Sequence, residues 1–181
     1  IVENSNDLGY TLTDKKNDSP DGSLTIPDGG ITAEFTNNKD LFGELNITKA
    51  VTGNALPTTP KTFNFRVTLT PPTSATPVNS TVKYGDVTYR IKTDDSKTVC
   101  IAEVSVTAGQ TITLTGIPNG TTYKVEELNG SSVMQVDGEK DSAGYQLIEA
   151  KSVTGTINCV PDADQTLVVW PEASFTNEKN E

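Results

Sequence analysis

Lys49 occupies a position at which a charged side chain is costly. The run Leu45–Val51 alternates with the two-residue period of a half-buried strand, and this alternation places Leu45, Ile47, Lys49 and Val51 on one face. A lone buried ammonium group costs several kcal/mol or gives up its proton. Lys49 is therefore either a strand-end lysine whose ammonium group reaches water or a participant in a reaction.

Two further polar residues fall on core-facing positions by the same parity argument. Glu127 shares a strand face with Val125, whereas its neighbour Glu126 falls on the opposite, solvated face. Asn177 shares a strand face with Phe175. We therefore expect a lysine, a glutamate and an asparagine to face the core together.

These three side chains can react with one another. Burial lowers the pKa of a lysine, which gives a neutral amine nucleophile, and it raises the pKa of a glutamate, which gives a proton donor and shuttle. The Asn177 carboxamide supplies the electrophilic carbon, and a protonated Glu127 can polarise its carbonyl and assist the departure of ammonia. The product is an uncharged amide between Lys49 and Asn177, so the buried charge disappears. Fixed geometry in a dry site contributes on the order of 7–11 kcal/mol to such a step.

The elements that must hold these side chains are predicted to be strands. Short strand-like runs recur between turn signals such as Pro118–Gly120 and Asn129–Gly130, and helical periodicity is almost absent. The clearest predicted strands are Leu45–Val51, Thr62–Leu69, Val87–Ile91, Thr98–Val106, Thr111–Thr115, Thr122–Leu128, Thr166–Val169 and Ala173–Thr176. This pattern is typical of a sandwich or barrel, and we interpret it as an all-β, Ig-like Greek-key sandwich.

The sequence also repeats itself. Residues Ala33–Lys39 nearly match Ala173–Lys179, and Ile1–Asn4 parallels Val125–Leu128. A Gly-Tyr pair follows in each copy, and the second of these pairs contains Tyr145. The repeat predicts that residues 1–40 are the C-terminal strands of an incomplete domain and that residues 41–181 are a complete second copy. We expect the chain to be an excised part of a longer protein, because it opens within a strand pattern.

Several sequence segments together resemble the collagen-adhesin B-type (Cna B-type) domains of Gram-positive pilins and surface adhesins. The segments 45–53 and 63–69 resemble the opening of such a domain, 116–127 its middle and 175–177 its closing strand. The order and spacing of these motifs over nearly all of 41–181 are most similar to the C-terminal domain of streptococcal-type major pilins. Each motif alone is weak evidence for the family, but the set of motifs in this order is specific to it.

The resemblance implies a role for each residue of the predicted reaction. It implies an isopeptide bond between Lys49 and Asn177, with Glu127 as the catalytic glutamate. In the incomplete first copy it implies Glu3 as the catalyst and Asn37 as an acceptor whose lysine comes from elsewhere. Cofactors and metals are not implied.

Composition excludes several other classes of function. The 181 residues carry a net charge of −10, which disfavours nucleic acid and anionic membranes as partners. The absence of histidine excludes Ser-His-Asp and Cys-His catalysis as normally built. Cys100 and Cys159 are either a single disulfide, which suits an extracellular chain, or two small buried thiols.

Together these observations predict a structural stalk or pilin module rather than an enzyme. We expect an extracellular, cell-wall-anchored surface protein of a Gram-positive bacterium, braced by an autocatalytic Lys–Asn isopeptide bond. Its expected partners are neighbouring domains or subunits of the same surface protein or pilus and the missing part of the first domain. The alternative is an adhesin domain that recognises host matrix or glycan.

Overall fold

The computed structural model describes residues 10–16, 34–39, 41–72, 81–90, 92–93, 98–159 and 168–181. The chain divides into two compact units, Ile1–Leu41 and Phe42–Glu181. No helix occurs among the described residues.

The first unit contains an antiparallel pair of strands. Strand β1 (Tyr10–Lys16) pairs with β2 (Glu34–Lys39), and a register shift falls between Leu12 and Asp14. Asn37 of β2 lies opposite Leu12.

The second unit is built from strands of four to eleven residues and a few shorter bridging strands. They are β3 (Phe42–Thr52), β4 (Thr62–Thr70), β5 (Thr81–Tyr84), β6 (Val87–Arg90), β7 (Lys92–Thr93), β8 (Thr98–Thr107), β9 (Thr111–Pro118), β10 (Thr122–Asn129), β11 (Ser132–Val133), β12 (Gln146–Lys151), β13 (Thr154–Thr156) and β14 (Glu172–Glu178). Buried and more exposed residues alternate along β3, β4, β10 and β14, as expected for strands with one face toward a core.

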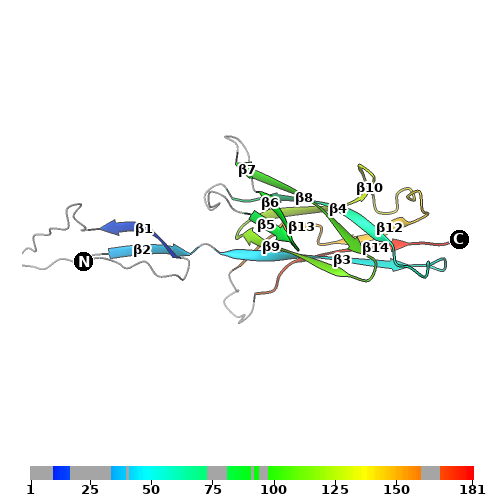
Figure 1. The fold of residues 1–181 in the computed structure, drawn as a ribbon, viewed down its shortest axis with the longest axis horizontal. Coiled ribbons are helices and arrows are strands. Elements are labelled where there is room, and N and C mark those ends of the chain that lie inside the picture. Colours follow the sequence, from blue (N-terminus) through cyan, green and yellow to red (C-terminus); the bar gives the residue numbers. More distant parts are fainter. Residues whose placement is uncertain are drawn as a thin grey trace, which may run out of the picture. The chain divides into compact units, whose positions relative to one another are not determined.

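The strands form two sheets (Figure 1). Within the described part of the chain, one sheet has the order β11-β10-β4-β8-β7, with β13 also paired to β10, and the other has the order β12-β14-β3-β9-β5-β6. Successive strands cross from one sheet to the other, as in β3 to β4 and β9 to β10. The predicted all-β, Ig-like sandwich is confirmed.

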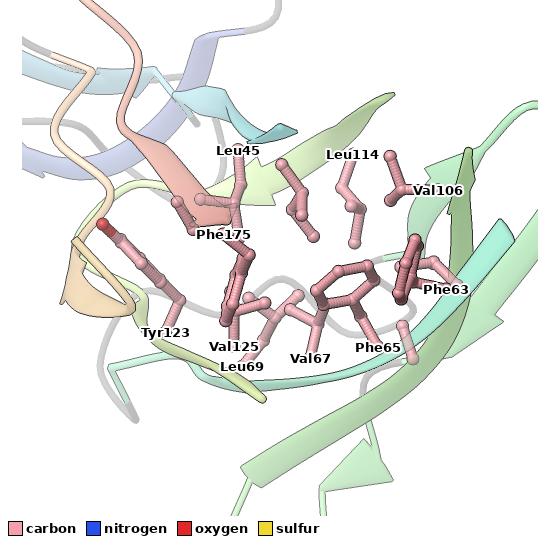
Figure 2. Packing of buried hydrophobic residues seen from close by; sticks show 14 of the residues in the cluster. Leu45, Phe63, Phe65, Val67, Leu69, Val106, Leu114, Tyr123, Val125 and Phe175 are labelled. Atoms are coloured by element: carbon pink, nitrogen blue, oxygen red, sulfur yellow. The ribbon is translucent and has the colours of Figure 1, made fainter. Parts of the chain in front are cut away.

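The core lies between the two sheets. Figure 2 shows Leu45 and Leu114 pointing from one sheet toward Phe65 and Val67 of the other. Phe65 also packs against Phe175 of β14, with ring centroids 4.9 Å apart. Burial of such side chains, at about 25 cal/mol per Å² of apolar surface, is the main force that holds the sheets together.

Two ladders set the positions of the polar residues that face this core. Strand β14 pairs with β3 in parallel, with Phe175 level with Lys49. Strand β10 pairs with β4 in antiparallel fashion in the opposite sheet, with Glu127 level with Phe65. Side chains alternate between the two faces of a strand, so Asn177 faces the same side as Phe175, two residues before it. These registers therefore direct Lys49, Glu127 and Asn177 into the same core.

The strand predictions differ from the structure in one wrong strand and in several strands that were not predicted, among them β5 and β12. The predicted strand Thr166–Val169 is wrong where it can be compared, because Val168 and Val169 are not in a strand. Val169 is 78% exposed and Pro171, which has no N–H to donate, follows closely. Strand β12 was not predicted, because a register shift between Leu147 and Glu149 interrupts its alternation.

The loop after β3 is hydrogen-bonded to the residues that follow β14. The Lys179 N–H donates to the Thr52 carbonyl at 2.9 Å, and the Ala55 N–H donates to the Lys179 carbonyl at 3.2 Å. Gly53 lies between these contacts with a φ of +117°, and a Cβ built there would lie 2.1 Å from the Lys179 carbonyl oxygen. This close approach of two backbones requires glycine.

We therefore predict that Gly53→Ala destabilises the protein by more than about 2 kcal/mol, because the two segments must separate to admit the methyl group. Gly85→Ala is the matched control: Gly85 also has a positive φ of +56°, but nothing lies within 4 Å of its Cβ position. Its cost should be about 1 kcal/mol, from conformational strain alone. Thermal unfolding of both variants measures the difference, and equal losses would contradict the steric explanation.

Candidate functional site

Three strands bring Lys49, Glu127 and Asn177 together. Lys49 comes from β3 and Asn177 from the adjacent parallel strand β14, two residues beyond the one level with Lys49. Glu127 comes from β10 in the opposite sheet. The three residues are far apart in the sequence, with 128 positions between Lys49 and Asn177.

The three side chains form a closed set of hydrogen bonds. The Lys49 Nζ donates to Glu127 Oε2 at 2.8 Å and also donates to Asn177 Oδ1. The Asn177 Nδ2 donates to the other carboxylate oxygen, Glu127 Oε1, at 2.6 Å. The carboxylate therefore bridges the amine and the amide nitrogen, while the amine also contacts the amide oxygen.

The set is removed from water. Lys49 and Asn177 are 0% exposed and Glu127 is 1% exposed, so the prediction that all three face the core is confirmed. Aromatic rings surround the group: the Lys49 Nζ lies 4.4 Å from the centroid of Phe63, and Phe65 is level with Glu127 on the neighbouring strand. Electrostatic interactions are strong in such a low-dielectric environment, and an unpaired charge there is costly.

Burial lowers the pKa of Lys49, and the carboxylate of Glu127 only partly offsets this effect through its charge and its hydrogen bond. The neutral amine is thus easier to form here than in water. A neutral amine has a lone pair, so it can act as a nucleophile toward the adjacent carboxamide.

The other residues considered in the sequence lie elsewhere. Glu126 points away from the core, where its carboxylate is 2.5 Å from the Lys124 ammonium group. Asn37 is in β2 of the first unit, and Glu3 lies outside the described residues. Side-chain geometry is therefore described for Lys49, Glu127 and Asn177 of the second unit, and not for Glu3 and Asn37 of the first.

The sequence left open a disulfide or two separate thiols for Cys100 and Cys159. In the structure they are free thiols. Cys100 is buried in β8 and Cys159 is half-buried. Burial raises the pKa of both thiols, which keeps them protonated and unreactive.

A second polar cluster next to the site was missed by sequence reasoning. Lys61 precedes β4 and forms an ion pair with Asp141 of the loop between β11 and β12. Its ammonium group also lies 4.5 Å from the ring centroid of Tyr145. The repeated Gly-Tyr pair pointed to Tyr145, but no periodicity links Lys61 to Asp141, because neither residue is in a strand.

Two further features are absent from the described part of the chain. It contains no group of three or more Cys, Asp or Glu residues placed to hold a metal ion. Within the same ranges there is no helix long and apolar enough to cross a bilayer.

Residues 43–179 match the family described as "Domain of unknown function (DUF7601)", and the chain belongs to this family. The match covers all the strands from β4 to β14 and all of β3 except Phe42. It includes the three residues of the buried set.

Several solved structures are similar to this chain. A mutant of the pilus-presented adhesin Spy0125 (Cpa) is 24% identical with a TM-score of 0.46, and the match covers 78% of this chain and 28% of the adhesin. A major pilin from Streptococcus pyogenes is 19% identical with a TM-score of 0.45, covering 98% of this chain and 64% of the pilin. Another major pilin structure from the same organism is 16% identical with a TM-score of 0.45, and the match covers 96% of this chain and 65% of the pilin. The chain thus spans less than two thirds of the length of each of these proteins. No curated protein sequence matches the chain.

We predict that both thiols of the denatured chain are alkylated without prior reduction, because neither is bonded in the structure. Intact mass after iodoacetamide treatment in denaturant should show two additions, and prior incubation with a reductant should not increase that number. A chain that takes up label only after reduction would contradict the free-thiol assignment.

Proposed function

We propose that the second unit is a structural module that crosslinks itself through an isopeptide bond between Lys49 and Asn177. The observation that carries the proposal is the buried set in which one carboxylate, Glu127, bridges the attacking amine and the amide nitrogen that must leave. The reaction is a single turnover on the chain's own side chains, so the module is not an enzyme.

The proposed reaction balances in atoms and protons. Glu127 Oε2 accepts a proton from the Lys49 Nζ, and the neutral amine attacks Cγ of Asn177. The Nζ–Cγ bond forms and the Cγ–Nδ2 bond breaks. The carboxyl group passes this proton to Nδ2 through Oε1, which already accepts a hydrogen bond from that nitrogen, and then takes the second proton that Nζ loses as it becomes an amide nitrogen. That second proton leaves with the departing ammonia, as ammonium. Glu127 ends as it began, and the product amide carries no charge.

The bond would brace the fold where the two parallel strands β3 and β14 meet. It would close a loop of 128 positions, and this constraint on the unfolded chain is worth roughly 4–5 kcal/mol if the estimate for disulfide loops of about a hundred residues transfers. Tension along the chain would then load a covalent bond rather than ladder hydrogen bonds. This behaviour suits a stalk.

The proposed context is the surface of a Gram-positive bacterium, where such a module would form part of a pilus or an adhesin stalk. The motif resemblance over residues 41–181 supports this context, together with the buried lysine, glutamate and asparagine that it implies. Neighbouring modules of the same surface protein are then the expected partners, and anchoring to the cell wall is part of the proposal.

The proposal extends to residues 1–40 as the C-terminal strands of an incomplete domain of the same kind. The sequence match between 33–39 and 173–179 supports this extension. Asn37 would accept a lysine supplied by a segment outside the chain, with Glu3 as the catalyst. A peptide covalently attached at Asn37 in protein isolated from its source, found by peptide mass mapping, would support this reading, and an unmodified Asn37 would contradict it.

We predict that the intact mass of the folded protein is about 17 Da below the sequence mass, because one ammonia is lost per bond. Lys49→Ala and Glu127→Ala should each show the full sequence mass. The matched controls are Lys124→Ala and Glu126→Ala, which remove the same residue types from the solvent-facing side of β10 and should retain the loss. A wild-type mass equal to the sequence mass would refute the crosslink.

We also predict that Glu127→Gln unfolds at a temperature at least several degrees lower than the wild type and is cut faster by trypsin, because the unfolded chain is no longer constrained. Glutamine keeps the size of the side chain, so packing changes little. Differential scanning calorimetry and timed proteolysis measure the effect. Equal stability with confirmed loss of the bond would mean that the crosslink does not brace the module.

A further inference from the structure

Lys61 lies at the boundary between solvent and the buried set. Its side chain is 30% exposed and lines a surface pocket of about 320 Å³, together with Leu56, Pro57, Pro60 and Tyr145. On its inner side, the Lys61 Nζ lies 5.0 Å from the ring centroid of Phe63. The same ring lies 4.4 Å from the Lys49 Nζ, so one aromatic side chain contacts both ammonium groups.

Asp141 holds Lys61 at this boundary. The Asp141 side chain is 7% exposed and is ion-paired with Lys61. Its Oδ1 accepts the N–H groups of Ala143 at 2.8 Å and Tyr145 at 2.9 Å, which fixes the carboxylate within its own turn. Burial would raise the pKa of Asp141, but the hydrogen bonds from Lys61 and from these backbone groups lower it overall, so the carboxylate stays charged.

Tyr145 completes the boundary. It is buried, and its ring meets that of Phe63 edge to face at a centroid distance of 5.3 Å. The Lys61 and Lys179 ammonium groups lie 4.5 Å and 4.7 Å from the Tyr145 ring centroid. Phe63 and Tyr145 therefore separate the pocket from the reacting amine.

We propose that Lys61, held over Phe63 and Tyr145 by Asp141, is a positioning residue that favours the uncharged, nucleophilic form of Lys49. This inference rests on the proposed crosslinking reaction. Lys61 does not touch the reacting atoms in this arrangement; it acts through its charge across an apolar ring, where screening by water is weak.

The charges that face Lys49 come from three elements. Glu127 of β10 is in direct contact and raises the pKa of Lys49, whereas Lys61 before β4 lowers it and Asp141 of the loop before β12 raises it. Lys61 and Asp141 thus act on the amine with opposite sign. Removal of either charge therefore leaves the effect of the other on Lys49 unopposed, so the two removals should change the pKa of Lys49 in opposite directions. A purely structural role would not give opposite changes.

The test measures the rate of crosslinking against pH. Unreacted full-length chain, isolated from inclusion bodies under denaturing conditions, is refolded across a pH series, and the ammonia loss is followed by intact mass. Lys61→Met should raise the pKa of Lys49, so the rising limb of the rate profile moves to higher pH and the rate at neutral pH falls. Asp141→Asn should move the limb to lower pH. We expect displacements of roughly half to one pH unit each.

Three further variants complete the design. Lys61→Arg keeps the charge and should restore the wild-type profile, Lys61→Gln should repeat the shift of Lys61→Met, and Lys124→Met, which removes a lysine from the outer face, should leave the profile unchanged. Circular dichroism of each variant establishes that it folds. If Lys61→Met does not fold, Lys61→Gln and Asp141→Asn still give the two opposite displacements.

The outcomes separate the two proposals. Opposite displacements support the role of Lys61. A wild-type chain that reacts while the Lys61 and Asp141 variants keep its profile, or move in the same direction, overturns the role of Lys61 and leaves the crosslink standing. A wild-type chain that loses no ammonia overturns both.

Discussion

The parallel pairing of β3 with β14 is the constraint on which the rest of the site depends. It sets Phe175 level with Lys49, and the side chain two residues further along β14, Asn177, then faces the same core. The antiparallel pairing of β10 with β4 directs Glu127 inward from the other sheet. Because the side-chain period of a strand is two, a slip of one residue in either ladder would turn a polar group to solvent. The apolar faces around them fix both registers.

A buried ammonium and a buried carboxylate are an expensive pair, because their mutual attraction seldom exceeds the cost of removing both from water. Here each polar atom of the set has a partner within the set, so the penalty is limited to desolvation. Conversion of Lys49 and Asn177 into a neutral amide would remove the ammonium group itself. If the proposed reaction occurs, the folded state before it would therefore be less favourable than the folded state after it, and this difference would favour the crosslink.

Strand parity was sufficient to predict that Lys49, Glu127 and Asn177 face the core, because each lies in a regular strand with apolar neighbours two residues away. Parity could not predict the pair of Lys61 and Asp141, which are 80 positions apart and lie in irregular segments. It also failed where β12 carries a register shift. Contacts made through loops depend on the tertiary fold, and local sequence patterns carry no information about them.

The same parallel pairing determines how the second unit meets mechanical load. Strand β3 begins at Phe42 and β14 ends at Glu178, and both run in one direction, so opposite pulls on those two points slide the strands along each other. Without a crosslink, the hydrogen bonds between the strands bear the force together in this shear geometry, whereas strands peeled from one end break their bonds one at a time. The backbone contacts of Gly53 and its neighbours with Lys179 continue the pairing past the end of both strands, which lengthens the region that shares the load.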